Sequence, residues 1–277
     1  MNFLSKLFPI TKKGINKIPS KLRVGNMYIE NLKPLGGIFK PGITKAGRLS
    51  LLGNLKDGTK VKVYNSFNLN QIHIRKMLGD IFIDDDVLFP DLIAYDDNFI
   101  IEKWIEGKPL DKINSFQLDK SSEYLINFLD KLHNDPIFCK IAKENLNSFC
   151  YLKDYLILRL NPWKQWIPVE KLLNAWFEAD YQTENIIESK ISHPDLSLTN
   201  LILSPEKKIY IIDNELLGVG KGWLLDINNS FFRRKVSEPI LKPLLNNFYN
   251  LSWKLRLVGS ALDSGDFDRA KRMAYVE

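Results

Sequence analysis

The sequence contains few of the residues from which metal centres and covalent cross-links are built. Its 277 residues include two cysteines, Cys139 and Cys150, which excludes a disulfide framework or a cysteine-based zinc site and favours a reducing compartment. The three histidines, His73, His133 and His193, are too scattered along the chain to form a histidine metal cluster.

Long apolar runs are also lacking. No run approaches the roughly 20 residues of a transmembrane helix. Ser5 and Lys6 interrupt the apolar residues near the start, so we expect no signal peptide and a cytoplasmic protein. An apolar content of 45% with 26% charged residues is ordinary for a globular protein, which at this length can form one large or two small domains.

Charge is distributed unevenly. Residues 1–62 hold thirteen Lys and Arg against two acidic residues, a net of +11, whereas residues 80–102 hold eight acidic residues and no basic one. The basic part favours an anionic partner: nucleotide phosphates, or weak contact of the N-terminus with a membrane surface. A solvated lysine-rich surface is the alternative. Because no recognition motif accompanies the scattered charge, we expect no specific nucleic-acid partner.

The most informative pattern is a predicted β-hairpin in the second half of the chain. Two apolar runs, Leu201–Leu203 and Ile209–Ile212, are separated by the polar, turn-forming residues Ser-Pro-Glu-Lys-Lys. Since a hairpin brings its ends together, we expect Asn200 and Asp213, which flank it, to lie side by side.

A further carboxylate precedes this hairpin in the segment His193-x-Asp195. Phosphoryl transfer needs a carboxylate to orient and deprotonate the attacking hydroxyl, and an amide plus a carboxylate to hold Mg²⁺ on the phosphates. Asp195 is therefore the candidate catalytic base, and Asn200 and Asp213 are the candidate metal ligands. The alternative is a polar turn with a chance His-x-Asp, but the combination of loop, hairpin and carboxylate favours phosphoryl transfer.

These residues resemble a known family. HPDLSLTN followed by IIDNE is similar to the H-x-D-x-x-x-x-N and D-x-[GE] pair of the protein-kinase-like small-molecule kinases, which include aminoglycoside phosphotransferases and choline/ethanolamine kinases. The resemblance implies transfer of the ATP γ-phosphoryl group to a hydroxyl with Mg²⁺, and a loop-shaping role for His193. It also implies a bilobal α+β fold, with a basic N-terminal extension at 1–28, a small antiparallel-sheet nucleotide-binding lobe at 29–104, and a larger, mainly helical catalytic and acceptor-binding lobe at 105–277.

Two glycines and a second predicted hairpin lie in the N-terminal half. The strand-like runs 48–55 and 60–64 are joined by a turn containing Asp57-Gly58, a strong hairpin signal. Gly36 and Gly37 precede this hairpin, and glycines let backbone amides approach phosphates closely, as in a flap that covers a nucleotide. Glycines of an ordinary turn-rich loop are the equal alternative.

The second run of this hairpin contains two lysines on one strand face, because side chains alternate along a strand. Lys62, between two valines, resembles the buried family lysine that pairs with the α- and β-phosphates, whereas Lys60, nearer the turn, is expected to be solvated. Family members pair that lysine with a glutamate from the next helix. The helix predicted over 69–78, closed by Gly79, contains no acid, so Lys62 pairs with an acid from elsewhere or only with the nucleotide.

A strand predicted from Phe99 runs into the sequence Lys-Trp-Ile-Glu-Gly-Lys-Pro-Leu, which resembles the family connector whose backbone binds adenine. Glu102 and Trp104 are the candidate nucleotide contacts there, and a plain strand end before a Gly-Pro turn is the alternative. A helix is predicted over residues 121–133 from its apolar spacing.

Residues 137–190 form an aromatic-rich, helical-looking insert. Helical aromatics are more often core than pocket, yet aromatics with nearby acids can receive a cationic acceptor, such as an amino-alcohol or an aminoglycoside-like molecule. Two alternatives to a small-molecule kinase stay open. The basic N-terminus favours a kinase acting on protein or a lipid-linked sugar, and the missing helix acid favours a nucleotide-binding pseudokinase.

Overall fold

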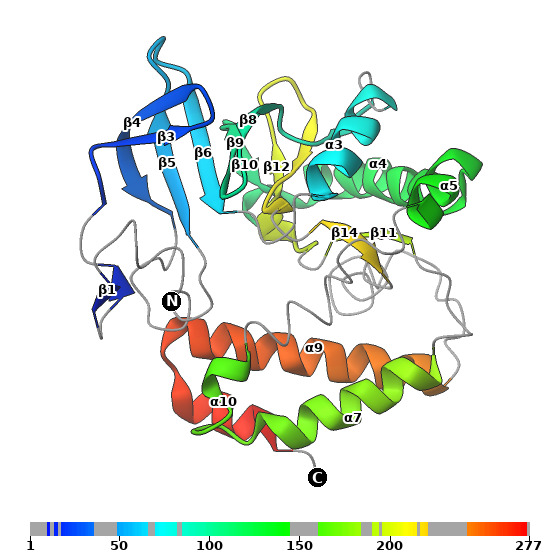
Figure 1. The fold of residues 1–277 in the computed structure, drawn as a ribbon. Helices are drawn as coiled ribbons and strands as arrows, with labels where there is room; N and C mark the ends of the chain where they lie inside the picture. The colour runs from blue at the N-terminus through cyan, green and yellow to red at the C-terminus, as the bar shows by residue number, and fades with distance from the viewer. Residues whose placement is uncertain are drawn as a thin grey trace.

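The computed structural model places most of the chain in two regions, a curled antiparallel sheet and a larger helical part (Figure 1). The residues that it describes are 10–11, 14–15, 18–35, 49–65, 70–81, 85–144, 160–183, 190–193, 196–214, 217–220 and 243–275. The predicted bilobal α+β fold, a sheet lobe followed by a mainly helical lobe, is confirmed. Among the helices within these ranges, none is long and apolar enough to cross a membrane.

The N-terminal sheet has six strands in the order β3-β4-β5-β6-β9-β8, and every neighbouring pair is antiparallel. Their bounds are Lys21–Val24, Met27–Pro34, Ser50–Asn54, Lys60–Asn65, Phe99–Lys103 and Leu92–Tyr95 in that order. The edge strand β3 comes from the predicted N-terminal extension. Insertion of β9 between β6 and β8 brings Lys62 directly opposite Glu102.

The predicted hairpin of β5 and β6 is confirmed. Its turn places Gly58 at φ 88°, a left-handed conformation that favours glycine, and the backbone amide of Thr59 donates to Oδ1 of Asp57 at 2.9 Å. That hydrogen bond lowers the pKa of the Asp57 carboxyl. The turn residues therefore hold the register that directs Lys62 inward.

Helix α3, Asn70–Ile81, follows β6 and does not end where the sequence predicts. Gly79 lies inside the helix instead of closing it, and its φ is not among the positive values. The helix continues because Gln71, Ile74, Arg75 and Leu78 bury one face, which offsets the cost of an interior glycine of about 0.5–1 kcal/mol. This buried face includes two polar side chains.

Helix α4, Ser115–Asn134, begins six residues before the predicted start at 121. Its first turn has no apolar spacing, and the helix is started by Asn114, whose side chain accepts a hydrogen bond from the Gln117 amide at 2.9 Å. Asp135 ends α4 and is followed by α5, Pro136–Glu144, as the Asn-Asp-Pro sequence predicts.

The predicted hairpin between Asn200 and Asp213 is also confirmed, and its strands are β12, Leu201–Leu203, and β13, Ile209–Ile211. It lies at the centre of a small sheet flanked by β10, Lys108–Pro109, and β7, Val87–Leu88. A nearby two-stranded sheet pairs β11, Lys190–Ser192, with β14, Gly218–Gly220.

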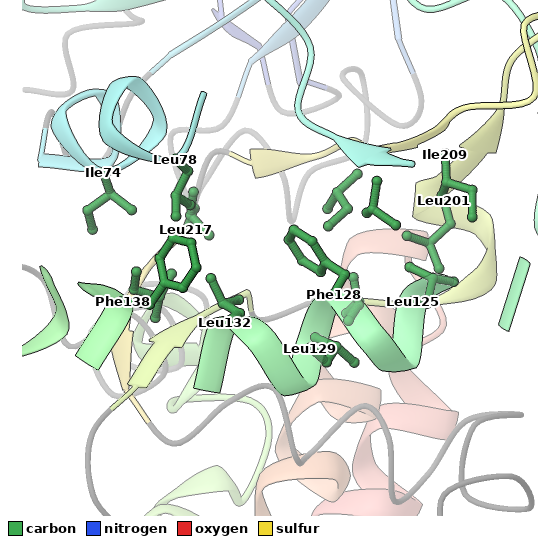
Figure 2. Close-up of a cluster of buried hydrophobic side chains, with 14 of the residues drawn as sticks. Ile74, Leu78, Leu125, Phe128, Leu129, Leu132, Phe138, Leu201, Ile209 and Leu217 are labelled. Atoms are coloured by element: carbon green, nitrogen blue, oxygen red, sulfur yellow. The ribbon is translucent and has the colours of Figure 1, made fainter. Parts of the chain in front are cut away.

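One hydrophobic cluster joins this hairpin to helices α3, α4 and α5 (Figure 2). Leu201 and Ile209 of the hairpin belong to the same buried cluster as Phe128 of α4 and Leu78 of α3. The cluster therefore connects the β12–β13 hairpin to α3, the helix that follows the strand of Lys62.

The remaining described helices form a separate layer below the sheets in Figure 1: α7, Val169–Gln182, α9, Pro243–Ser264, and α10, Phe267–Ala274. Their core contains Trp163 and Trp176, and the Trp176 indole donates to Ser252 Oγ at 2.6 Å. These two tryptophans of the predicted acceptor insert are core residues, which agrees with the general tendency of helical aromatics.

Candidate functional site

The two candidate metal ligands lie at the open end of the β12–β13 hairpin. The Ile212 amide donates to the Asn200 carbonyl at 2.9 Å, which continues the hairpin pairing by one step and brings Asn200 next to Asp213. Asn200 is 9% exposed, whereas the Asp213 side chain is 40% exposed and can reach a ligand. Asp213 has φ 63°, a strained value for a non-glycine residue and common at functional sites.

His193, two residues before the candidate base in the sequence, contacts this hairpin end. The buried ring donates from Nε2 to the Ile212 carbonyl at 3.2 Å, because a carbonyl oxygen can only accept. Asp195, the candidate base, lies outside the described residues, between the buried His193 and the buried Leu196. The catalytic role of Asp195 therefore stays a prediction.

Lys62 reaches across to the same hairpin end. Its Nζ lies 2.5 Å from Asp213 Oδ1 and its side chain is only 7% exposed, whereas the Lys60 side chain is 57% exposed and pairs with Glu106. The burial matches the sequence-based preference for Lys62 over Lys60. The ion pair between Lys62 and Asp213 thus joins strand β6 to the end of the β12–β13 hairpin.

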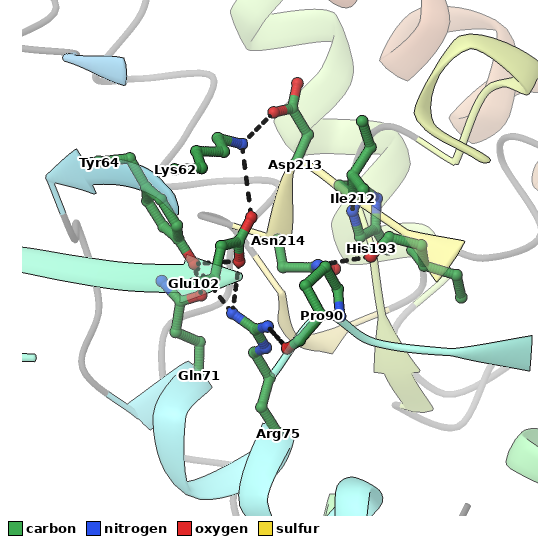
Figure 3. Close-up of polar contacts among 11 residues, drawn as sticks. Lys62, Tyr64, Gln71, Arg75, Pro90, Glu102, His193, Ile212, Asp213 and Asn214 are labelled. Atoms are coloured by element: carbon green, nitrogen blue, oxygen red, sulfur yellow. Dashed lines mark hydrogen bonds and ion pairs between the residues drawn. The ribbon is translucent and has the colours of Figure 1, made fainter. Parts of the chain in front are cut away.

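Glu102 is the acid that the sequence could not locate. It projects from β9, directly opposite Lys62, and its Oε1 lies 3.8 Å from Lys62 Nζ (Figure 3). Glu102 is 1% exposed. The structure thus places the Glu102 side chain against the lysine. Any contact of Glu102 with a nucleotide, as predicted from the connector, stays a prediction.

Sequence analysis missed Arg75, which lies in α3 and contacts Glu102. Its Nη1 donates to Glu102 Oε2 at 2.8 Å, and its own side chain is 1% exposed. The available signal was its position on the apolar face of a helix, four residues after Gln71, where a solvated arginine does not fit.

The connector after β9 packs closely on the catalytic hairpin. The Trp104 amide donates to the Lys60 carbonyl at 3.0 Å, so this amide hydrogen-bonds to the neighbouring strand of the sheet. The Trp104 side chain is partly exposed and stays a candidate nucleotide contact. Gly107 has φ 156°, and a Cβ there would lie 2.4 Å from the Leu203 carbonyl oxygen. Only glycine permits this approach. Gly36 and Gly37, the other candidate nucleotide contacts, lie outside the described residues.

The donor set at the hairpin end fits magnesium. Among the described residues no group of three or more His, Cys, Asp or Glu could hold a metal. Mg²⁺ in phosphoryl-transfer sites is held by one or two protein oxygens together with substrate phosphates. An amide oxygen from Asn200 and a carboxylate from Asp213 meet that requirement.

Comparisons with known proteins identify the fold. No family model matches the chain, and no curated protein does. Among solved structures, a thermostable mutant of aminoglycoside phosphotransferase APH(4)-Ia is similar, with a TM-score of 0.56 and 13% identity, over 89% of this chain and 92% of that one. The chain has the fold of the aminoglycoside phosphotransferases.

Two further structures with this aminoglycoside phosphotransferase fold are similar over comparable lengths. APH(2")-IIia, solved with GDP and kanamycin, has a TM-score of 0.54 and 16% identity, over 88% of this chain and 91% of that one. Choline kinase LicA from Streptococcus pneumoniae has a TM-score of 0.52 and 14% identity, over 88% and 92%. The predicted resemblance is confirmed at the level of fold.

Proposed function

We propose that the protein is an ATP-dependent phosphotransferase that moves a γ-phosphoryl group to a hydroxyl of a small molecule. The observation that carries this proposal is the meeting of Lys62 with the Asn200 and Asp213 pair at the hairpin end. One cation from the sheet and two oxygen ligands from the hairpin are the groups that a nucleotide phosphate chain with Mg²⁺ requires.

Each residue has a separate role in this proposal. Lys62 contacts the α- and β-phosphates, Asn200 and Asp213 hold Mg²⁺, and Asp195 orients and deprotonates the attacking hydroxyl. His193 keeps the loop in place through its hydrogen bond to the Ile212 carbonyl. Bound Mg²⁺ would supply neutralisation of the phosphate charge. The site would catalyse transfer mainly by positioning and electrostatic stabilisation.

We further propose that the division into lobes follows the connector. The sheet strands up to β9 would form the nucleotide-binding lobe, and the chain from residue 105 the catalytic and acceptor-binding lobe. Gly36, Gly37 and Trp104 would contact the nucleotide from the small lobe and the connector. The close approach of Gly107 to Leu203 supports a fixed boundary here, because it joins the connector to the catalytic hairpin.

For the acceptor we propose an amine-bearing alcohol. Of the aromatics in the insert, Trp166 and Tyr181 are exposed, at 55% and 77%, and Glu178 lies one turn before Tyr181 on α7. Exposed aromatic faces near a carboxylate attract a cation. The similar structures support this choice, since one was solved with kanamycin and another is a choline kinase.

The pseudokinase alternative relied on the absence of an acid in the helix after the lysine strand. Glu102 supplies an acid to Lys62 from β9, so that absence no longer favours a protein without turnover.

The test is a screen for ADP release with Mg-ATP against amino-alcohols, aminoglycosides and neutral sugars. We expect turnover with an amine-bearing alcohol and loss of that turnover in Asp195→Asn. The matched control is Asp97→Asn, which removes a carboxylate at an exposed turn away from the site. Equal turnover in wild type and Asp195→Asn would contradict the assignment of the base, and a preference for neutral sugars would contradict the amine-bearing acceptor.

A further inference from the structure

Helix α3 presents an arginine, and no acid, on the face that meets the lysine strand. Gln71, Arg75 and Leu78 follow each other at helical spacing and are 0%, 3% and 0% exposed. A guanidinium buried to this degree needs fixed partners, because an unpaired buried charge is costly. The role of this buried face of α3 can therefore be inferred from the contacts of Arg75.

The guanidinium of Arg75 is held in one orientation. Its Nη1 donates to Glu102 Oε2 at 2.8 Å and to the Tyr64 hydroxyl at 3.0 Å, and its Nη2 donates to the Pro90 carbonyl at 2.5 Å (Figure 3). These partners lie on β9, on β6 and in the segment before β8. A planar fork with several donors can bind all three at once, which a lysine ammonium at this position cannot do equally well.

These contacts divide the two oxygens of Glu102 between two cations. Oε2 receives Arg75 and also the Tyr64 hydroxyl at 3.2 Å, while Oε1 faces Lys62 Nζ at 3.8 Å. A separation of 3.8 Å is too long for a hydrogen bond, so Glu102 attracts the Lys62 ammonium electrostatically but does not hydrogen-bond to it. Lys62 instead lies 2.5 Å from Asp213, at the proposed phosphate position.

We infer that Arg75 is a positioning residue for nucleotide binding, acting through Glu102 on Lys62. Arg75 occupies one carboxylate oxygen and neutralises much of the Glu102 charge, so Glu102 orients Lys62 without holding it in a hydrogen bond that would compete with phosphates. The helix thus supplies a cation that orients a strand acid, in place of supplying the acid itself. This inference rests on the proposed function, in which Lys62 binds the α- and β-phosphates.

The experiment measures the Kd for MgADP by titration calorimetry, since MgADP carries both phosphates and needs no acceptor. Arg75→Met should raise the Kd about tenfold, equivalent to ~1.4 kcal/mol, because Lys62 is then drawn to an unshared Glu102 charge. Arg75→Lys, which retains the charge, should raise it less. Lys76→Met is the matched control: it removes a cation from the next position of α3, where the side chain is exposed and contacts Tyr95, and should leave the Kd unchanged.

A double-mutant cycle with Lys62→Ala separates positioning from general structural damage. In the Lys62→Ala background, Arg75→Met should have no further effect on the Kd, because the residue through which it acts is gone. Equal weakening in both backgrounds, or no weakening in the wild-type background, would overturn the inference alone. An unchanged Kd in Lys62→Ala itself would overturn the proposed function of that lysine together with the inference.

A milder variant covers the case in which Arg75→Met does not fold. Tyr64→Phe removes the hydroxyl that accepts from Arg75 and donates to Glu102, and keeps the ring. It should raise the Kd less than Arg75→Met does, by roughly two- to fivefold in the wild-type background, because the direct contact between Arg75 and Glu102 remains, and by nothing in Lys62→Ala. The same Kd as wild type in a folded Tyr64→Phe protein would count against the inference.

Discussion

Replacing Glu102 by glutamine should destabilise the protein far more than the same change at any exposed acid. Glu102 and its two cationic partners, Lys62 and Arg75, have side chains that are 2%, 7% and 1% exposed. Glutamine keeps the shape but leaves both buried cations without this carboxylate, and breaking a buried pair costs about 3–5 kcal/mol. At about 2–4 °C of Tm per kcal/mol for a chain near this size, the melting temperature should fall by about 6–20 °C.

Glu106→Gln is the control because it breaks a shorter ion pair of the same chemistry. Glu106 Oε1 lies 2.6 Å from Lys60 Nζ, but the two side chains are 63% and 57% exposed. An exposed pair contributes about 0–1 kcal/mol, so its Tm should fall by no more than ~4 °C. Thermal unfolding followed by circular dichroism measures both. Equal losses at the two positions would refute the reasoning that burial, and not distance, sets the cost.

A double variant tests whether charge balance is the cause. Glu102→Gln combined with Arg75→Met removes one charge of each sign, so the net charge of the buried group is unchanged. The loss of stability should be smaller than the sum of the two single losses. Strict additivity would show that the two side chains act independently, which the 2.8 Å contact between them does not predict.

Three further predictions concern other parts of the site. Asp213→Asn should remove most of the Mg²⁺-dependent rise in Tm that ATP produces, whereas a change confined to the base should preserve it; a retained rise would argue against Asp213 as a metal ligand. Gly107→Ala should lower the free energy of unfolding by about 1–3 kcal/mol, because of the positive φ and because the added Cβ would meet the Leu203 carbonyl. Gly79→Ala, where an added Cβ meets nothing within 4 Å, should raise it by about 0.4–1 kcal/mol, and urea unfolding measures both. Tyr181→Leu should raise the acceptor KM by about 2–30-fold without changing the ATP KM, and an equal effect from the exposed Phe116→Leu on α4 would refute a specific contact.

The parts of the site that could be predicted are those encoded locally. Asp57-Gly58 specifies its hairpin through backbone conformation, and the Pro-containing turn before β13 does the same for the catalytic hairpin. Because a hairpin fixes which residues face each other, the spacing of Asn200 and Asp213 was enough to place them together. The start of α4 was missed because a single capping side chain, with no apolar periodicity, determines it.

The partner of Lys62 could not be predicted, because it depends on strand order and register between β6 and β9, which are far apart in the sequence. Glu102 was visible as an acid that follows the apolar run Phe99–Ile101, and Arg75 as a charged residue on the apolar face of its predicted helix. Burial forces such residues to find opposite charges, but it does not specify which element supplies them. A buried lysine requires a negative charge nearby, and this requirement can be met from any neighbouring element, not only from the next helix.

This requirement explains how the buried face of α3, the helix after the lysine strand, can carry no acid; Asp80, which lies within this helix, is exposed. A buried lysine needs a nearby carboxylate to stay charged and oriented, and β9 meets that need directly across the ladder from Lys62. Once the acid lies on the strand, an acid on α3 would add a second buried negative charge, and a neutral side chain would leave Glu102 bound more tightly to Lys62. A cation at Arg75 avoids both outcomes. The cation on α3 and the acid on β9 are thus expected to be interdependent in any variant of this site.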